Sequence, residues 1–318
     1  MGLLDEIAAA AELIYRHLGP TPEYCWPLIC ERAGAEVWVK HENHTPIGAF
    51  KVRGGLVYLD DLMKRAPETP GVIAATRGNH GQSVAYAARR AGIAAVMVVP
   101  HGNSVEKNRA MAALGAELIE HGADFNAAHD HSKELAADRG LHAFPSYHPL
   151  LVRGVATYSL ELFNGVPDLD TVYVPIGLGS GINGVISARD ALGLKTRVVG
   201  VVAEQAAAYA LSFEAGRPVS TNACDTMADG VAVRVPDAGA LAVMLEGAER
   251  VVTVSEDEIK AAMRAYYSDT HNLAEGAGAA PLAALLKERE KMAGKKVAVV
   301  LSGGNVDTEI YRAVLAGT

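Results

Sequence analysis

Residues 44–55 are the most informative stretch of this chain, and they read His44-Thr45-Pro46-Ile47-Gly48-Ala49-Phe50-Lys51-Val52-Arg53-Gly54-Gly55. The turn at 46–49 leads into a predicted helix, which places Lys51 on the first helical turn. A lysine can form a Schiff base only if its amine is deprotonated part of the time, which burial beside Phe50 would favour. Most lysines lie at the surface instead, so this stretch alone leaves both interpretations open.

Three glycine-containing segments further along the chain extend this hypothesis. Residues 76–81 follow an apolar run and precede a helical pattern, so helix N–H groups and the Thr76 hydroxyl are suited to bind a substrate carboxylate. Residues 177–181 also stand between a predicted strand and a predicted helix, where backbone N–H groups would hold an anion such as phosphate. Together with Lys51 and with Ser302-Gly303-Gly304-Asn305, these segments predict a pocket for a phosphorylated aldehyde.

The second glycine-rich segment has two other interpretations. It is compatible with an ordinary strand-to-helix turn. Residues 179–184 also match the pattern GxGxxG, and Glu204 ends the next predicted strand where a ribose-binding acid would lie, as in a nicotinamide dehydrogenase. That pattern is weak by itself, and it leaves the Lys51, Asn79 and Ser302 segments without a role.

The pattern along the chain is that of an α/β protein. Apolar runs bounded by Gly or Pro alternate with longer amphipathic stretches, which is typical of helices packed on buried parallel strands. The expected strands are 35–40, 72–76, 94–99, 117–120, 172–175, 198–202, 251–254 and 297–301. We expect two lobes, each a mostly parallel twisted sheet flanked by helices. The small lobe would span 52–145, and the large, discontinuous lobe 1–51 and 146–318.

Composition limits the partners and the compartment. The 318 residues carry a net charge of −8 and form no basic stripe, so a nucleic acid or an anionic membrane has little electrostatic support as a ligand. Small molecules are the expected ligands. The three cysteines show no CxxC pairing, and no secretory leader is visible, which favours a reducing cytoplasm. The longest apolar stretches are of strand length, so we expect a soluble protein.

Taken in order, these segments resemble those of the pyridoxal-phosphate-dependent serine/threonine dehydratases. Their fold is that of the tryptophan synthase β-subunit group, also called fold type II. The likeness covers nearly the whole chain and includes residues 99–117, 226–233 and 275–280. It implies pyridoxal 5′-phosphate as the cofactor, held in the cleft between two lobes, and a homodimer as the assembly.

The resemblance also implies roles for individual residues. Lys51 would form the Schiff base with the cofactor and would remove the substrate α-proton, Asn79 would bind the phenolic oxygen, and Ser302 would face the pyridine nitrogen. The implied cofactor-binding residues are Phe50, Lys51, Asn79, Gly177, Leu178, Gly179, Ser180, Gly181 and Ser302. The implied substrate-binding residues are Thr76, Arg77, Gly78, Asn79, His80 and Glu275. Glu275 also fits a carboxylate placed at a helix start for the dipole.

The implied activity is that of an ammonia-lyase. A β-hydroxy L-amino acid of the serine/threonine class would lose water by α,β-elimination and yield a 2-oxo acid and ammonia. The alternatives are a dehydratase for a bulkier substrate such as phenylserine or 3-hydroxyaspartate, an amino-acid racemase of the same fold, and a binding module without catalysis. Because the chain ends soon after the Ser302 segment, we expect no added regulatory domain and a catabolic or specialised role.

Two departures from the family pattern carry further expectations. Arg77 replaces the small residue that normally precedes Gly-Asn-His, on the cofactor face opposite Lys51. An arginine there is compatible with contact to an acidic substrate group, with a differently shaped pocket, or with exposure to solvent. Val202 and Ala208 stand where many relatives carry cation-binding carboxylates. A hard cation needs several oxygen ligands, so we expect no metal.

Overall fold

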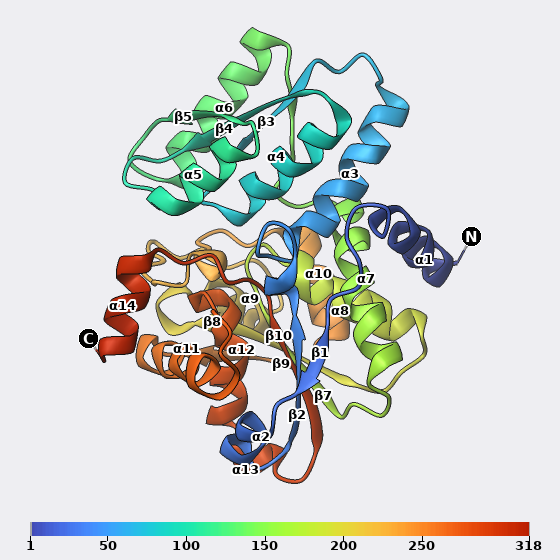
Figure 1. The fold of residues 1–318 in the computed structure, drawn as a ribbon, viewed down its shortest axis with the longest axis vertical. Helices are drawn as coiled ribbons and strands as arrows, with labels where there is room; N and C mark the ends of the chain where they lie inside the picture. Colours follow the sequence, from blue (N-terminus) through green and yellow to red (C-terminus); the bar gives the residue numbers. More distant parts are fainter. Residues whose placement is uncertain (1, 318) are drawn as a thin grey trace.

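The computed structural model describes residues 2–317 and contains two β-sheets with helices packed on their faces (Figure 1). The larger sheet has the order β1-β2-β10-β7-β8-β9, and the smaller one has the order β5-β4-β3-β6. Every neighbouring pair is parallel except β1 and β2. The strands are β1 Glu23–Cys25, β2 Glu36–His41, β3 Gly71–Ala75, β4 Ala94–Val99, β5 Glu117–Glu120, β6 His142–Ala143, β7 Thr171–Pro175, β8 Arg197–Ala203, β9 Arg250–Val254 and β10 Lys296–Leu301.

The predicted fold class and all eight predicted strands are confirmed, with boundaries that differ by at most one residue. Sequence reasoning missed β1 and β6. These strands have three and two residues, which is too short for an alternation or an apolar run to be recognised. They exist because β1 pairs with β2 at one edge of the larger sheet, and β6 pairs with β3 at one edge of the smaller sheet.

Helices connect the strands and cover both sheets. They are α1 Leu3–Ile14, α2 Pro27–Ala33, α3 Lys51–Arg65, α4 Asn79–Ala91, α5 Val105–Ala113, α6 Phe125–Arg139, α7 Pro149–Gly165, α8 Ser180–Ala191, α9 Ala208–Ala215, α10 Ala238–Gly247, α11 Glu256–Thr270, α12 Gly276–Lys287, α13 Arg289–Met292 and α14 Thr308–Ala316. Three short 3₁₀ turns are η1 Glu42–His44, η2 Glu204–Ala206 and η3 Asp229–Val231. Local signals define several ends. For example, Ser255 and Glu258 form a reciprocal capping box at the start of α11.

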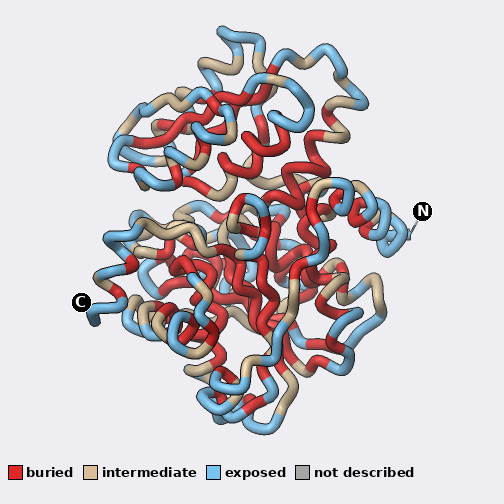
Figure 2. The backbone as a smooth tube through the Cα atoms, in the orientation of Figure 1, coloured by how far each residue is buried: buried red, intermediate tan, exposed pale blue. Residues whose placement is uncertain are grey.

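The strands are buried on both faces, as parallel strands between helix layers must be. In β7, Tyr173 packs in the core shared with α11 and α12, whereas its neighbours Val172 and Val174 pack with α7 and α8. The smaller sheet is divided in the same way between α3 and α4 on one face and α6 on the other. Figure 2 shows this burial running through both sheets.

Helix α3 links the two parts of the molecule, because it packs on both α4 and α7 (Figure 1). The crossing of α3 and α7 is close. A Cβ atom added to Gly154 would lie 2.5 Å from the Arg53 carbonyl oxygen, and one added to Gly54 would lie 2.8 Å from the Leu151 carbonyl oxygen. These glycines therefore allow the start of α3, which carries Lys51, to lie close against α7.

Within residues 2–317, no helix combines the length and the apolar character needed to cross a bilayer.

Candidate active site

The Lys51 segment is tied by its backbone to the segment that follows β10. Ala49 forms an antiparallel bridge with Gly303. The Phe50 N–H donates to the Ser302 carbonyl oxygen at 3.0 Å, and the Gly304 N–H donates to the Gly48 carbonyl oxygen at 2.9 Å. Two of the predicted site segments, about 250 residues apart in the chain, therefore lie side by side.

The third segment, at the start of α4, joins them through side chains. The Asn305 amide nitrogen donates to the Ile47 carbonyl oxygen and to the Asn79 Oδ1 atom, both at 2.8 Å. Ser83, on the first turns of α4, donates its hydroxyl to the Lys51 carbonyl oxygen at 2.6 Å. The structure thus brings the Lys51, Asn79 and Ser302 segments together at one place.

Lys51 is the first residue of α3, and its amine is poised for deprotonation. Burial lowers the pKa of Lys51 to about 8, although the Glu275 carboxylate opposes this shift. The Nζ atom lies 5.2 Å from the centre of the Phe50 ring, which is itself packed edge-on against Tyr158. An amine with this pKa is a far better nucleophile and base near neutral pH than a surface lysine.

The Thr76–His80 turn is shaped by one hydroxyl. Thr76 Oγ1 accepts the N–H groups of Gly78 at 3.0 Å and of Gly81 at 2.9 Å. Gly78 has φ +156°, and a Cβ atom there would lie 2.4 Å from Lys107 Cδ, so only glycine fits. Thr76 therefore holds the turn at which α4 begins and binds the N–H group of its third residue, Gly81.

His80 lies in the same turn and carries an unused polar atom. Its Nε2 atom is buried and has no hydrogen-bond partner within residues 2–317. Burial, helped by the charge of Lys51, lowers the pKa of His80 to about 3, so the ring is neutral. A buried polar atom without a partner is costly, and a ligand in this site would relieve that cost.

The glycine-rich segment 177–181 forms the start of α8. Gly179 has φ +104°, and α8 begins at Ser180. The first N–H groups of α8 have no partner inside the helix, and with the helix dipole they form a site for an anion. The Tyr209 hydroxyl donates to the Leu178 carbonyl oxygen at 3.1 Å, and the Tyr158 hydroxyl donates to that of Gly181 at 3.2 Å. These bonds hold the loop in shape.

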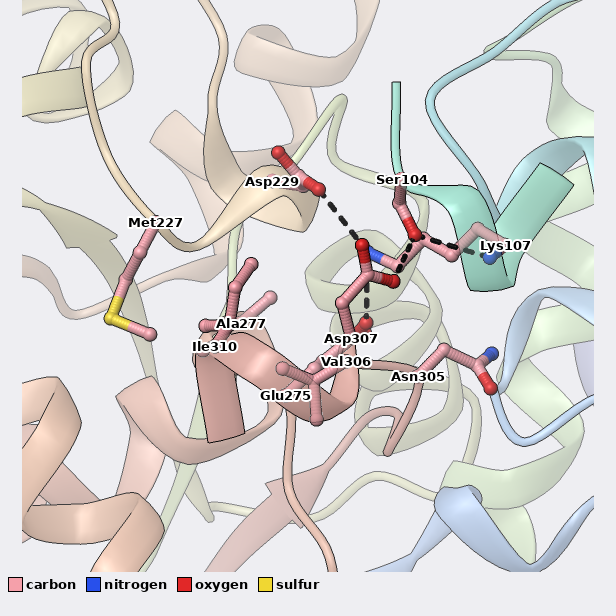
Figure 3. Close-up of a pocket in the computed structure, with 11 residues that line it drawn as sticks. Ser104, Lys107, Met227, Asp229, Glu275, Ala277, Asn305, Val306, Asp307 and Ile310 are labelled. Atoms are coloured by element: carbon pink, nitrogen blue, oxygen red, sulfur yellow. Dashed lines mark hydrogen bonds and ion pairs between the residues drawn. The ribbon is translucent and has the colours of Figure 1, made fainter. Parts of the chain in front are cut away.

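A group of charged residues adjoins Asn79, and sequence reasoning identified only one of its members, Glu275. The Asn79 amide nitrogen donates to Glu275 Oε1 at 2.6 Å. Lys107 Nζ lies 3.6 Å from Glu275 Oε2 and 3.2 Å from Asp229 Oδ2 (Figure 3). Lys107, Asp229 and Asn305 belong to stretches that support the family resemblance, but nothing local in the sequence marks them as partners.

Arg77 lies at the edge of this group. Its side chain is 43% exposed, and its Nε atom is 3.9 Å from Asp229 Oδ1. The guanidinium is therefore neither buried nor held by a close hydrogen bond.

No group of three or more His, Cys, Asp or Glu side chains within residues 2–317 is placed to hold a metal ion. Glu204, the carboxylate closest in sequence to the expected cation position, lies 3.3 Å from the Lys287 ammonium.

These residues fit pyridoxal phosphate. This cofactor needs an amine of lowered pKa, an anion site for its phosphate, and polar side chains around its ring. Lys51 supplies the first, and the start of α8 supplies the second. Asn79 and the nearly buried Ser302 lie on segments that are bonded to the Lys51 segment, and they would provide the third.

Comparison with known proteins agrees with this fit. Residues 14–303 match the model of the family described as pyridoxal-phosphate dependent enzyme. The chain therefore belongs to the family of pyridoxal-phosphate-dependent enzymes. Membership decides between the two cofactor hypotheses in favour of pyridoxal phosphate and against a nicotinamide dinucleotide, and it makes the chain an enzyme rather than a binding module.

Two curated relatives are informative. The L-threonine ammonia-lyase of Geobacter sulfurreducens is 35% identical over 286 residues, which cover 90% of this chain and 71% of the relative. The L-threo-3-hydroxyaspartate ammonia-lyase of Saccharomyces cerevisiae is 30% identical over 313 residues, which cover 98% of this chain and 96% of the relative.

Solved structures share the whole fold. The processed form of threonine deaminase isoform 2 from Solanum lycopersicum matches with a TM-score of 0.92 and 30% identity, over 99% of this chain and 93% of that one. A pyridoxal 5′-phosphate-dependent aspartate racemase matches with a TM-score of 0.91 and 30% identity, over 96% of each chain. The same architecture therefore serves elimination and racemisation, so residues of the site must distinguish them.

Proposed function

We propose that this enzyme is an ammonia-lyase that converts a β-hydroxy L-amino acid of the serine/threonine class to a 2-oxo acid and ammonia. The observation that carries the proposal is the lowered pKa of Lys51 in a site bounded by the Asn79 turn and the Ser302 segment. The names of the curated relatives support elimination as the reaction.

The proposed binding arrangement follows from the groups described above. The N–H groups at the start of α8, with Gly177, Leu178, Gly179, Ser180 and Gly181, would hold the phosphate. Phe50 would pack against the cofactor, Asn79 would bind its phenolic oxygen, and Ser302 would meet the pyridine nitrogen. We place this group between a small lobe, 52–145, and a large lobe, 1–51 and 146–318. The strands of the smaller sheet all fall within the former range.

The cofactor, Lys51 and Ser302 would each have a different role in the reaction. When bound, the cofactor would supply the conjugated ring that withdraws electrons from the substrate Cα. Lys51, with its lowered pKa, would hold the cofactor and then take the α-proton. Because the Ser302 hydroxyl carries no charge, it would leave the pyridine nitrogen largely unprotonated, which favours prompt loss of the β-substituent.

The substrate carboxylate would bind at the start of α4. The N–H groups of Asn79 and His80 lie at the N-terminus of α4, where the dipole favours an anion. The unused Nε2 atom of the neutral His80 adds a polar contact in the same place. Glu275, which we expected near the substrate side chain or amine, already accepts a hydrogen bond from Asn79.

Arg77 argues against racemisation as the main activity. Racemisation needs an acid/base group on the cofactor face opposite Lys51, the face that the family resemblance assigns to position 77. A guanidinium stays protonated in proteins and cannot take a proton from Cα. Elimination is therefore the proposed outcome. A larger β-hydroxy substrate, such as phenylserine or 3-hydroxyaspartate, is the second candidate. For 3-hydroxyaspartate, the exposed Arg77 would be available to the side-chain carboxylate.

The test is a substrate panel with the purified holoenzyme. Release of 2-oxo acid and ammonia is measured for L-serine, L-threonine, phenylserine and L-threo-3-hydroxyaspartate, together with chiral chromatography of the remaining amino acid. We expect equal amounts of oxo acid and ammonia from at least one of these substrates. A D-amino acid that accumulates as fast as the oxo acid would replace the proposal with the racemase alternative.

A further inference from the structure

The side-chain amide of Asn79 is fixed in one orientation by a chain of hydrogen bonds. The Ile47 carbonyl oxygen can only accept, so the Asn305 atom 2.8 Å away from it must be the amide nitrogen. That nitrogen also donates to Asn79, so the Asn79 atom 2.8 Å from it must be Oδ1. The other end of the Asn79 amide is then Nδ2, which donates to Glu275 Oε1 at 2.6 Å.

Both ends of this series of hydrogen bonds assign the same orientation to the Asn79 amide. A backbone carbonyl fixes one end, and a carboxylate, which accepts but does not donate, fixes the other. Reversing the Asn79 amide would place its oxygen against Glu275 and its nitrogen against the Asn305 nitrogen, so both hydrogen bonds would be lost. Two lost bonds at a partly buried site are costly compared with the small energy of an amide flip in water.

The Lys107 ammonium lies 3.6 Å from Glu275 Oε2 and keeps a counter-charge beside this carboxylate. Burial raises the pKa of the Glu275 carboxyl, and the nearby Lys107 ammonium opposes that rise. Lys107 is itself 7% exposed and is also paired with Asp229. In Figure 3 the Glu275 carboxylate points toward the Lys107 ammonium across the pocket.

The consequence concerns what Asn79 can offer to a ligand. Its nitrogen carries two hydrogens, of which Glu275 takes one. The second remains for a group in the site, so Asn79 presents a donor. A phenolic oxygen that meets a donor is stabilised in its deprotonated form.

We propose that Glu275 and Asn305 are positioning residues that hold the Asn79 amide as an N–H donor toward the phenolic oxygen of bound pyridoxal phosphate. The proposal rests on the cofactor contact assigned to Asn79 above. It gives Glu275 a role through Asn79 instead of through the substrate. It also joins residues of both sheet regions, since Asn79 begins α4, whereas Glu275 and Asn305 lie beside α12 and β10.

The test compares the cofactor affinity of two variants, Asn305→Asp and Asn305→Ala. If Asn305 only filled space, Asn305→Ala would weaken binding more, whereas the proposal predicts that Asn305→Asp weakens it more. Asn305→Asp keeps the size of the side chain but supplies only acceptors, so it drives the Asn79 amide to reverse. Asn305→Ala removes the contact and leaves the amide free to turn. The cofactor dissociation constant is measured by titrating each apoenzyme with pyridoxal 5′-phosphate, and the absorption spectrum is recorded at one pH.

We expect Asn305→Asp to weaken cofactor binding about 10-fold or more, and Asn305→Ala to weaken it less. In the Asp variant, the visible band should lose intensity to the near-ultraviolet, because a phenolic oxygen that faces an acceptor keeps its proton. Asn103→Ala is the matched control, since Asn103 is a buried asparagine whose amide donates to Asn108 instead. That control should bind the cofactor and absorb as the parent enzyme does.

Glu275→Gln provides a second route if Asn305→Asp does not fold. A neutral amide at 275 can present either an oxygen or a nitrogen to Asn79, so the orientation is no longer enforced from that side. The same spectral change, at smaller amplitude, supports the proposal. A larger loss for Asn305→Ala than for Asn305→Asp, or unchanged spectra in both Asn305→Ala and Glu275→Gln, would overturn it. Neither readout needs turnover, so the result stands apart from the choice of substrate and reaction.

Discussion

Lys51 and Arg53 lie two residues apart at the start of α3, yet their surroundings shift the pKa values of the two side chains in opposite directions. Arg53 is completely buried and binds two carboxylates, with Nε 2.7 Å from Glu42 and Nη1 2.6 Å from Glu161. Burial disfavours its charge, but these carboxylates outweigh that effect and raise the pKa of Arg53. Lys51 has no such partner, and burial lowers its pKa to about 8.

The contrast shows how one helix start serves two purposes. Glu161 also accepts from the buried Lys40 at 2.8 Å, so Arg53 links α3 to α7 and to strand β2. Such a paired group anchors the backbone. Because Arg53 anchors the start of α3, the Lys51 amine can be held at the site without a carboxylate paired to it. Glu275, whose carboxylate opposes the lowering of the Lys51 pKa, accepts a hydrogen bond from Asn79 and pairs with Lys107.

The largest expected effect is on catalysis. Lys51→Met should reduce oxo-acid release by at least about 10²–10⁴-fold, because it removes the proposed general base as well as the amine that holds the cofactor. The measurement is a coupled assay with cofactor in excess. Lys64→Met is the matched control, since that lysine is exposed and pairs only with Asp60 four residues earlier. Equal activity in the two variants would remove Lys51 from the chemistry.

The next effect is on stability and concerns the paired cation. Arg53→Met should lower the free energy of unfolding of the apoenzyme by about 3–5 kcal/mol, because it removes the cation beside the buried Glu42 and one of the two cations beside Glu161. Urea denaturation measures the change. Arg65→Met removes an exposed pair with Asp61 and should cost less than about 1 kcal/mol. Similar losses in both variants would show that the buried network does not anchor α3.

A smaller effect on stability has the opposite sign and concerns the Lys51 amine. Because the pKa of Lys51 is lowered in the folded chain from 10.5 to about 8, the charged lysine destabilises the fold below pH 8. Apoenzyme carrying Lys51→Met should therefore be more stable by roughly 1–3 kcal/mol below pH 8. The gain should shrink as the pH rises from about 8 to above 10.5, where the amine becomes neutral in both the folded and the unfolded state.

Urea denaturation of both apoproteins at several pH values tests this, with Lys64→Met as the control that shows no pH-dependent gain. A constant difference across that range would mean that Lys51 does not carry a lowered pKa in the apoenzyme.

The smallest expected effect is that of removing metal ions. Lys287 places its ammonium 3.3 Å from Glu204 and 3.1 Å from Glu258, so these carboxylates already have a cation supplied by the chain. Exhaustive chelation should leave turnover unchanged and shift the melting temperature by less than about 2 °C. A large loss that magnesium or calcium reverses would show that an ion competes with Lys287.

Much of the fold could be predicted because its signals are local. The buried strands are apolar runs with clear ends, as in Ala94–Val99, and their burial on both faces needs no knowledge of neighbours. The short strand His142–Ala143 had no such signal, since it is a strand only through its pairing with β3. For the site, the sequence singled out Lys51, Asn79 and Glu275, but nothing in it indicated that Asn305 bonds to Asn79 or that Lys107 pairs with Glu275.

What the sequence by itself determined is therefore the set of elements and the reactive segments between them. Glycines that permit tight turns and apolar residues that must be buried act through their own backbone and side chains. Tertiary structure alone decided the charge state of Lys51, the orientation of the Asn79 amide and the pairing of Arg53. These properties depend on distances of about 3 Å between groups far apart in the chain, and electrostatic and hydrogen-bond energies change steeply over such distances.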